Sequence, residues 1–256
     1  MTWLQVAASV PLVALAVAVA AKERLGLTRD LLSAAVRAAV QLAAVGVVLL
    51  LLFEHAATAG VIAWVAVMLL IAGQVAGRRG RAVPHARILA TASIAAGSLP
   101  TVAVLIVFEI LPVRPEVIIP VAGMIVATAM QATGLTLLRL AQEICHARPA
   151  IEARLALAMT VDRAFAPNRR SAARTALLPA IDSTKVVGLV SLPGAMTGLI
   201  IAGVDPLTAI RYQIVVMYML LAAATLAAAA AGHLAQRVLF DPRAHRLRLP
   251  VGSDEP

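Results

Sequence analysis

The chain has 256 residues, of which 61% are hydrophobic and 14% charged, too few polar residues to cover the surface of a soluble domain of this length. A net charge of +9 would suit nucleic acid only if the basic residues shared one soluble face, whereas they fall in short segments between apolar runs, so we exclude nucleic acid as a partner. Aromatic residues make up only 3%, which disfavours a β-barrel with aromatic girdles. We predict an all-α integral membrane protein whose direct surroundings are the lipid bilayer.

Seven apolar stretches are long enough to cross about 30 Å of hydrocarbon as helices. Six carry no charged residue, and the second is interrupted only by Arg37. We therefore predict a polytopic protein with about seven transmembrane helices in a single domain over residues 1–249, with a short polar C-terminal tail at 250–256. The predicted spans are residues 2–21, 31–53, 56–77, 88–108, 117–138, 186–204 and 212–232.

Lysine and arginine are concentrated on one side of the predicted spans. If the N-terminus is outside, all but four of the 22 basic residues fall in cytoplasmic segments, the exceptions being Arg37, Arg114, Lys185 and Arg211. Positively charged loops are retained in the cytoplasm. We therefore predict an outside N-terminus and a cytoplasmic C-terminus, in a multi-pass protein of the cell inner (plasma) membrane.

The longest connection, residues 139–185, is predicted to be the cytoplasmic face of the protein. Apolar residues recur every four positions from 151, which predicts a short amphipathic helix over 151–162. We expect Pro167 and Asn168 to end this helix before a second helical stretch begins. Such a helix either docks on a cytoplasmic protein or lies on anionic lipid, and the pattern alone favours neither.

The sequence contains no motif that indicates catalysis. His-Glu-x-x-His and Gly-x-Ser-x-Gly are both absent, and neither lysine follows a glycine as a phosphate-binding P-loop requires. The single cysteine, Cys145, excludes a disulfide within the chain. We predict that the chain is not an enzyme and holds no cofactor, so that any ATP hydrolysis, with its ATP and Mg, belongs to a partner chain.

Several motifs resemble those of a known transporter family. The residues from Glu152 to Pro179, which end in Leu-Pro, resemble the Glu-Ala-Ala loop of ABC importer permeases. Closer matches are RAAVQL at 37–42, PVAGMIVATAM at 120–130 and VGLVSLPGAMTGLIIAGVDPLTAIRYQIVV at 187–216, which resemble the iron-export (Fet-type) and plant aluminium-sensitive (STAR-type) ABC permeases. These stretches spread over most of the chain.

The resemblance implies a permease subunit of an ABC-type exporter, with iron as the expected cargo and metal homeostasis as its purpose. It also implies a homodimer that works with a separate cytoplasmic ABC ATPase subunit. A non-metal cargo such as a nucleotide sugar, and a secondary transporter without an ATPase, stay open as alternatives, and no metal-binding residue is identified. Within the coupling segment, 139–180, the resemblance assigns ATPase coupling to Ile151, Glu152, Leu155, Met159, Arg174 and Pro179.

A gate is predicted in the sixth span. Pro193 and Gly194 should interrupt its helix, and Gly194 with Gly198 forms a small-xxx-small pair that lets another helix approach closely. A kinked, tightly packed helix of this kind can serve as the moving part of a gate. Ordinary helix packing is the alternative.

Five residues are candidates for the transport pathway. Arg37 and Gln41 lie one turn apart in the second span. Either the two residues line a cavity, or the Arg37 side chain extends to the cytoplasmic surface of the membrane. Thr128 and Gln131 stand where the family pattern has asparagines, and if those asparagines contact cargo, the departure implies a different substrate here. Glu109 belongs to a group of carboxylates at the outer ends of the spans, which suits a hard cation or is simply solvated.

Overall fold

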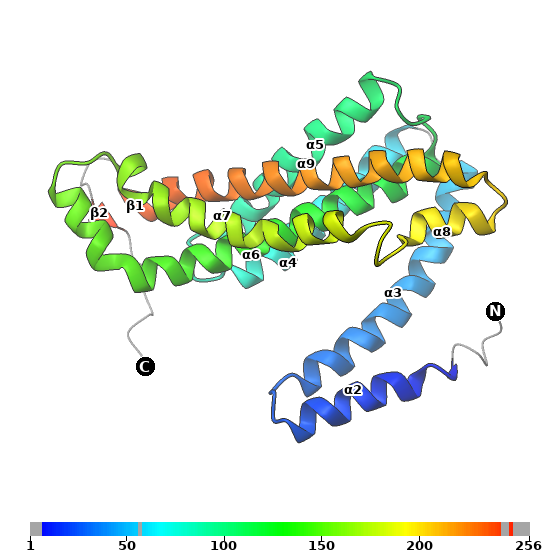
Figure 1. Ribbon diagram of the computed structural model, residues 1–256, viewed down its shortest axis with the longest axis horizontal. Coiled ribbons are helices and arrows are strands. Elements are labelled where there is room, and N and C mark those ends of the chain that lie inside the picture. The colour runs from blue at the N-terminus through cyan, green and yellow to red at the C-terminus, as the bar shows by residue number, and fades with distance from the viewer. Residues whose placement is uncertain (1–6, 56–57, 242–245, 248–256) are drawn as a thin grey trace. The chain divides into compact units, whose positions relative to one another are not determined.

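The structure is a computed structural model that describes residues 7–55, 58–241 and 246–247; for residues 47–55, 58, 241 and 246 it describes the backbone alone. The described residues are helical apart from turns, loops and the paired two-residue strands β1 (Phe240–Asp241) and β2 (Arg246–Leu247) (Figure 1). The prediction of a helical protein is therefore confirmed. The tail at 250–256 lies outside the described residues. The chain divides into two compact units, Met1–Ala57 and Thr58–Pro256, which we describe separately.

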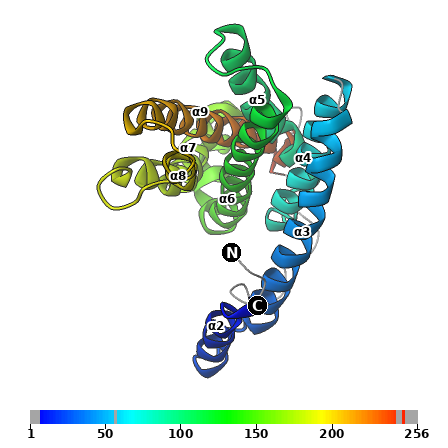
Figure 2. The same ribbon diagram turned by 90° about the vertical axis from the view of Figure 1, so that its right-hand side faces the viewer.

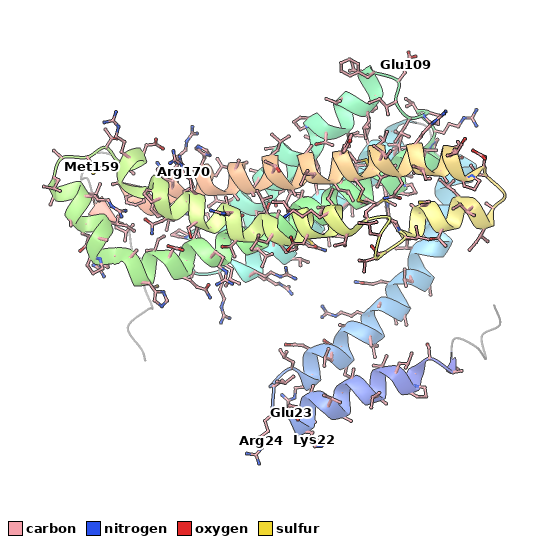
Figure 3. All side chains as sticks on the ribbon, viewed as in Figure 1. Lys22, Glu23, Arg24, Glu109, Met159 and Arg170 are labelled. Carbon is pink, nitrogen blue, oxygen red and sulfur yellow. The ribbon has the colours of Figure 1, made fainter. Side chains whose placement is uncertain are left out.

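The first unit is a pair of helices, α2 (Val10–Lys22) and α3 (Thr28–His55), which contact each other. The turn between them contains Arg24 and Gly26, both with positive φ, and Figure 3 shows Arg24 at this turn. Lys22 occupies the last turn of α2, where a cation interacts favourably with the helix dipole. Most described side chains of both helices are exposed within the unit.

The second unit is a bundle in which α6 contacts four other helices and α9 runs along α5, α6 and α7 (Figure 2). α6 and α9 are the longest helices, and α8 is a short helix that contacts α9. The described helices of this unit are α4 (Thr58–Arg79), α5 (Ala86–Val107), α6 (Pro115–Ala156), α7 (Val161–Val186), α8 (Gly194–Ile201) and α9 (Pro206–Leu239).

Four described helices, α4, α5, α6 and α9, are long and apolar enough to cross a membrane, and α2 is a shorter apolar helix. The chain is thus a multi-pass membrane protein. The spans predicted at 117–138 and 212–232 fall within α6 and α9, and the described parts of those at 56–77 and 88–108 coincide with α4 and α5, apart from Phe108, which follows the end of α5. The predicted total of about seven spans stays a prediction.

Small residues bring the helices of the second unit together. A Cβ atom on Gly97 of α5 would lie 2.6 Å from the carbonyl oxygen of Ala223 in α9. A Cβ atom on Gly77 of α4 would lie 2.6 Å from Cα of Arg87 in α5. Only glycine permits such close approach, the packing typical of membrane helices. The alanine-rich end of α9 serves the same purpose, because Ala223, Ala224, Ala227, Ala228, Ala231 and Ala235 are fully buried.

The helix boundaries predicted for residues 139–185 are wrong in two respects. α6 continues through Pro149 to Ala156, so the helix expected over 151–162 is instead the end of α6, a turn and the start of α7. α7 then continues through Pro167, which was expected to end a helix. An internal proline costs about 3 kcal/mol, and here the tertiary packing of neighbouring residues such as Phe165 and Asn168 outweighs that preference.

The predicted span 186–204 is also not a single helix. α7 ends at Val186, residues 187–193 are irregular, and α8 begins only at Gly194. Gly188 has φ of 82°, a left-handed conformation that residues with a side chain rarely adopt, and Pro193 has no amide hydrogen to donate. Together they replace the expected kink by a complete break of seven residues.

Candidate functional site

The coupling segment, residues 139–180, forms a helical hairpin from the second half of α6 and the first part of α7 (Figure 1). Residues 157–160 connect the two helices, and we call them the hairpin tip. Ala158 has φ of 60°, and its amide donates to the carbonyl of Leu155 at 3.0 Å, while the amide of Met159 donates to that of Arg154 at 3.2 Å. This pair of bonds is a Schellman motif, which gives α6 a defined end at the tip.

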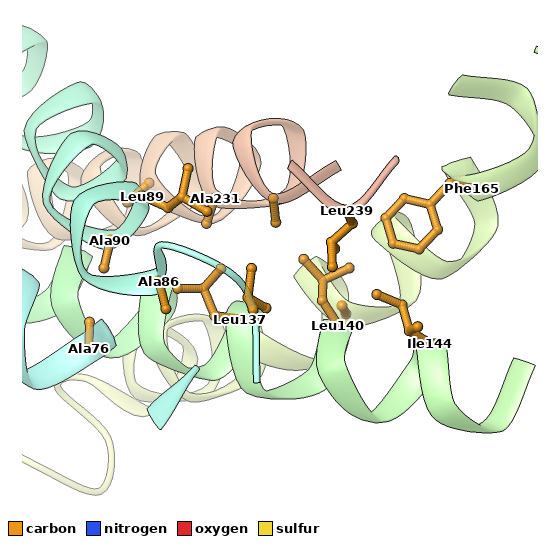
Figure 4. Close-up of a cluster of buried hydrophobic side chains, with 14 of the residues drawn as sticks. Ala76, Ala86, Leu89, Ala90, Leu137, Leu140, Ile144, Phe165, Ala231 and Leu239 are labelled. Atoms are coloured by element: carbon orange, nitrogen blue, oxygen red, sulfur yellow. The ribbon is translucent and has the colours of Figure 1, made fainter. Parts of the chain in front are cut away.

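Two predicted coupling residues lie inside the hairpin. Ile151 and Leu155 are buried and belong to the same hydrophobic cluster as Phe165. Phe165 packs edge-on against Phe240 with ring centroids 5.1 Å apart, and Figure 4 shows it beside Leu239 at the end of α9. Ile151 and Leu155 therefore hold the hairpin together, and their side chains are not available to contact another protein.

A polar network also joins the two helices of the hairpin. The amide of Asn168 donates to Glu143 Oε2 at 3.1 Å, and Ser171 Oγ donates to Glu143 Oε1 at 2.8 Å. Arg154 donates to the carbonyl of Ala164 at 3.0 Å and to Asn168 Oδ1 at 3.4 Å. Because Asn168 is buried, losing one partner would leave a polar group unsatisfied, so this network fixes the spacing of α6 and α7.

A second network joins the hairpin to α9. Arg169, on α7, donates to Asp162 Oδ1 at 2.7 Å and also to Gln236 Oε1 on α9. Gln236 in turn donates to Asp162 Oδ1 at 3.4 Å. The hydrogen bond from Arg169, followed by that from Gln236, holds the pKa of the Asp162 carboxyl below its ordinary value of 3.8. The hairpin is thus anchored to the bundle next to its tip.

Three further predicted coupling residues lie at different places on the hairpin. Glu152 is exposed and accepts from Arg148 Nε at 2.8 Å, one helical turn away. Met159 is half-buried at the tip, as Figure 3 shows, and Arg174 is exposed further along α7. Leu157 at the tip is 78% exposed, an apolar side chain in the connection between the helices.

A cavity of about 390 Å³ lies between α6, α7 and α9, and we call it the central cavity. It brings together four residues that the sequence placed in three groups: Thr128 and Gln131 from α6 (pathway), Pro179 from α7 (coupling), and Pro193 at the start of α8 (gate). Thr128 donates its hydroxyl hydrogen to the carbonyl of Met124 at 3.0 Å. The polar lining also includes Ser183, Thr184 and Ser191.

α7 connects the hairpin tip to the wall of the central cavity. It runs without interruption from Val161, next to the tip, to Val186, and its residues between Ala176 and Thr184 line the cavity. The helical rise makes the distance from Asp162 to Thr184 about 33 Å. A displacement of the tip would therefore move the cavity wall, because a packed helix moves as a rigid element.

The predicted gate residues lie at the break that follows α7. Pro193 is the N-cap residue of α8, and α8 has no buried residue. No heavy atom within the described part of the chain comes within 4 Å of a Cβ built on Gly194 or Gly198. The two glycines therefore make no close contact with another helix of this chain.

The other pathway candidates lie elsewhere. Arg37 and Gln41 are exposed on α3, in the first unit. Glu109 follows α5, is exposed with φ of 49°, and is not among the residues that line the central cavity. Figure 3 shows Glu109 in the connection between α5 and α6. Of the three candidates in the second unit, the structure thus brings together Thr128 and Gln131.

Metal-binding groups are sparse in the part of the chain that the structure describes. No group of three or more His, Cys, Asp or Glu residues there is placed to hold a metal ion. Cys145 is exposed on α6. The described residues that line the central cavity offer hydroxyl and amide groups and include no charged side chain.

Sequence reasoning missed Leu157, Glu143 and Asn168. An exposed leucine in a membrane protein carries no local signal, because the same residue elsewhere would face lipid. Glu143 and Asn168 are 25 positions apart and are joined only by the hairpin. Asn168 was expected to end a helix, an expectation taken from its neighbour Pro167.

Comparison with known proteins relates nearly the whole chain to one family. Residues 3–240 match the uncharacterised protein family UPF0014. The chain is 42% identical over 233 residues to the UPF0014 membrane protein STAR2 of Oryza sativa, covering 91% of this chain and 82% of the relative. It is 36% identical over 249 residues to the protein ALUMINUM SENSITIVE 3 of Arabidopsis thaliana, covering 97% and 91%.

A bacterial relative extends the comparison. The probable iron export permease protein FetB of Escherichia coli is 39% identical over 236 residues, which cover 92% of this chain and 91% of the relative. No solved structure matches the chain.

Proposed function

Because the chain belongs to the UPF0014 family of membrane proteins, we propose that it is the permease subunit of an ABC-type exporter that removes a metal, expected to be iron, from the cytoplasm. The cargo is taken from the name of the Escherichia coli relative, which describes a probable iron export permease. ATP and Mg would bind to a separate ATPase subunit, and two copies of the chain would form the membrane part.

We propose that the hairpin end of the second unit faces the cytoplasm of a cell whose inner (plasma) membrane holds the protein. Basic residues are clustered at that end: Arg78 and Arg79 occupy the last turn of α4, and Arg237 the last turn of α9. The side chain of Arg79 lies next to Gly134 of α6, and that of Arg169 next to Gly232 of α9. This distribution fits the positive-inside rule and supports an outside N-terminus.

The observation that carries this proposal is the hairpin with its continuous helix α7. The hairpin presents Leu157 at its tip and Glu152 in the last turns of α6 to the surroundings, while Ile151 and Leu155 fill its interior. An exposed apolar side chain with polar residues around it is typical of a protein contact, which has an apolar core and a polar rim. The ATPase would hold the tip, with Met159 at the contact and Arg174 further along α7, and α7 would carry the motion to Pro179 and the central cavity.

Transport into inside-out membrane vesicles tests the proposal. Vesicles from cells that make the chain together with its ATPase should accumulate radioactive iron when ATP is added. Combined Leu157→Ser and Glu152→Gln substitutions should abolish both accumulation and co-purification of the ATPase. Val113→Ser is a matched control, because Val113 is 65% exposed in the connection between α5 and α6.

Two results would contradict this function. Accumulation without ATP would indicate a secondary transporter. Full ATPase binding by the double variant would mean that the tip is not the docking surface. Thermal unfolding of each variant should match that of the wild type, since Leu157 and Glu152 bury little surface.

A non-metal cargo, such as a nucleotide sugar, is the second candidate. The observation in its favour is the lining of the central cavity, which has hydroxyl and amide groups but no carboxylate among the described residues. Hard cations are normally bound by carboxylates together with other oxygen ligands. Competition between iron and organic solutes in the same vesicle assay separates the two cargoes.

A further inference from the structure

A second cavity lies at the break between α7 and α8, and we call it the amide cavity because Gln213 lines it. Its volume is about 460 Å³, within the range of about 300–1,000 Å³ typical of small-molecule sites. Thr184, Val187 and Met217 line both this cavity and the central cavity. The two cavities are therefore adjacent along α9.

Gln213 has no hydrogen-bond partner although it is almost completely buried. Gln213 is 3% exposed, and neither its Nε2 nor its Oε1 has a hydrogen-bond partner among the described residues. Its neighbours Ile210, Ile214 and Met217 in the lining are apolar. A buried amide without partners costs about 1–3 kcal/mol, whereas an apolar side chain of similar shape would cost nothing of this kind.

Two other polar residues line the amide cavity. Thr184 donates its hydroxyl hydrogen to the carbonyl of Ala180 at 2.7 Å. Tyr218 is 68% exposed, so it differs from Gln213 in being open to its surroundings. In the break, the amide of Gly188 donates to the carbonyl of Ser191 at 3.0 Å. Gln213 is therefore the buried side chain in this wall that has both a donor and an acceptor free.

Gln213 lies near one end of the predicted span 212–232, in α9, a helix long and apolar enough to cross a membrane. Irregular backbone within a membrane is tolerated where it lines a cavity, and interrupted helices commonly form the binding sites of transporters.

The lining also restricts the chemistry of the ligand. None of the described residues around the amide cavity is charged, so a bare hard cation would find no anionic ligand there. Met196 and Met217 offer thioether sulfurs, which prefer soft metals such as Cu(I) to iron. An uncharged molecule with a donor beside an acceptor matches the amide.

We propose that the amide cavity binds an uncharged organic group that carries a hydrogen-bond donor next to an acceptor, as amides and hydroxamates do, and that Gln213 bonds to both. The inference rests on the proposed export function, which it deepens by giving the class of cargo. A metal would cross this cavity as an uncharged chelate rather than as a hydrated ion.

Ferric tris(acetohydroxamate) is a suitable probe, because three hydroxamate anions neutralise the ferric ion and leave N–H groups beside oxygen acceptors. Equilibrium dialysis of the purified chain should show saturable binding of this chelate and none of ferrous ion alone. Gln213→Leu should weaken chelate binding at least tenfold. Gln74→Leu, at an exposed position of α4, should leave it unchanged.

Thermal unfolding of the same variants distinguishes a ligand-binding amide from a structural one. Gln213→Leu should unfold at the same temperature as the wild type or higher, because it removes an unpaired polar group. A lower unfolding temperature, unchanged chelate binding in this variant, or binding of ferrous ion in place of the chelate would overturn the proposal. A further contradicting outcome concerns silver ion, which serves as a substitute for Cu(I). If silver ion binds through Met196 and Met217 and the chelate does not bind, the cavity is a soft-metal site and the proposal fails.

These results are independent of the vesicle assay, because dialysis uses the purified chain without ATPase. If ATP-driven iron accumulation is seen but Gln213→Leu binds the chelate normally, the export function stands and this inference fails. If chelate binding depends on Gln213 but accumulation never requires ATP, the ABC-exporter function fails instead.

Discussion

The coupling hairpin and the region from 187 to 201 are neighbours in sequence but are held in opposite ways. The hairpin has a hydrophobic core around Phe165, a polar network around Asn168 and an anchor to α9 through Arg169. In the region from 187 to 201 no residue is buried, and Leu189 is 89% exposed. A lever must be rigid and a gate must move at low cost, so this contrast supports our proposal that the hairpin transmits motion and that the break with α8 acts as the gate.

The substitution expected to have the largest effect on stability is Phe165→Ala. Removing a fully buried phenylalanine and its contact with Phe240 should lower the free energy of unfolding by about 3–5 kcal/mol. Leu189→Ala should change it by less than about 0.5 kcal/mol, since that side chain is exposed. Chemical unfolding in mixed micelles measures both. Similar losses in the two variants would mean that another chain covers Leu189.

A smaller loss is expected from Asn168→Ala. This substitution leaves Glu143 and Arg154 each without one partner, so unfolding should become easier by about 1–3 kcal/mol. Ser171→Ala is the matched control, because it removes one bond to Glu143 and keeps that of Asn168. If the two variants lose the same stability, the network acts through Glu143 alone and Asn168 does not set the spacing of the hairpin.

Gly198→Ala should have an effect of opposite sign. An added Cβ meets nothing within 4 Å, and alanine favours a helix over glycine by about 1 kcal/mol, so α8 should become slightly more stable. Gly97→Ala should destabilise, because its Cβ would meet the Ala223 carbonyl oxygen at 2.6 Å. Unfolding free energies of the two variants measure the difference. A loss in Gly198→Ala would indicate that a second copy of the chain packs on α8.

The membrane helices were predictable because a long uncharged run decides its own structure in lipid. α4 and α5 therefore match the predicted spans 56–77 and 88–108 to within two residues at each described end, and α9 extends the predicted span 212–232 by six residues at one end and seven at the other. The structure of the hairpin was harder to predict from the sequence. The spacing of Ile151 and Leu155 correctly marks an apolar face, but spacing does not tell whether that face meets another protein or, as here, the neighbouring helix.

Partners distant in sequence explain the other differences. Pro167 looks like a helix end locally, yet α7 is held on both sides of it by Phe165 and Asn168. A single glutamine in the apolar run at 212–232 gives no sign of being unpaired, since that depends on which residues surround it in the fold. Thr128 and Gln131 were named from a resemblance, and their meeting with Pro179 in one cavity required the structure.

The smallest expected effect concerns the anchor between hairpin and α9, and it depends on pH. Arg169 and Gln236 hold the pKa of Asp162 below 3.8, so the folded state favours the ionised carboxylate. The anchor therefore contributes stability above about pH 4, and that stability is lost as the pH falls through the lowered pKa. Asp162→Asn should unfold at a slightly lower temperature than the wild type at pH 6, and the difference should shrink as the pH falls below 3.8.

The control for this measurement is Asp182→Asn, which removes a 3.9 Å contact between Asp182 and Lys185 whose two side chains are both exposed. Such exposed pairs contribute little, so this variant should follow the wild type at every pH. A pH-independent difference for Asp162→Asn would mean that Asp162 acts through its shape rather than its charge. The anchor would then rest on the bond between Arg169 and Gln236, and the hairpin would stay rigid in acid.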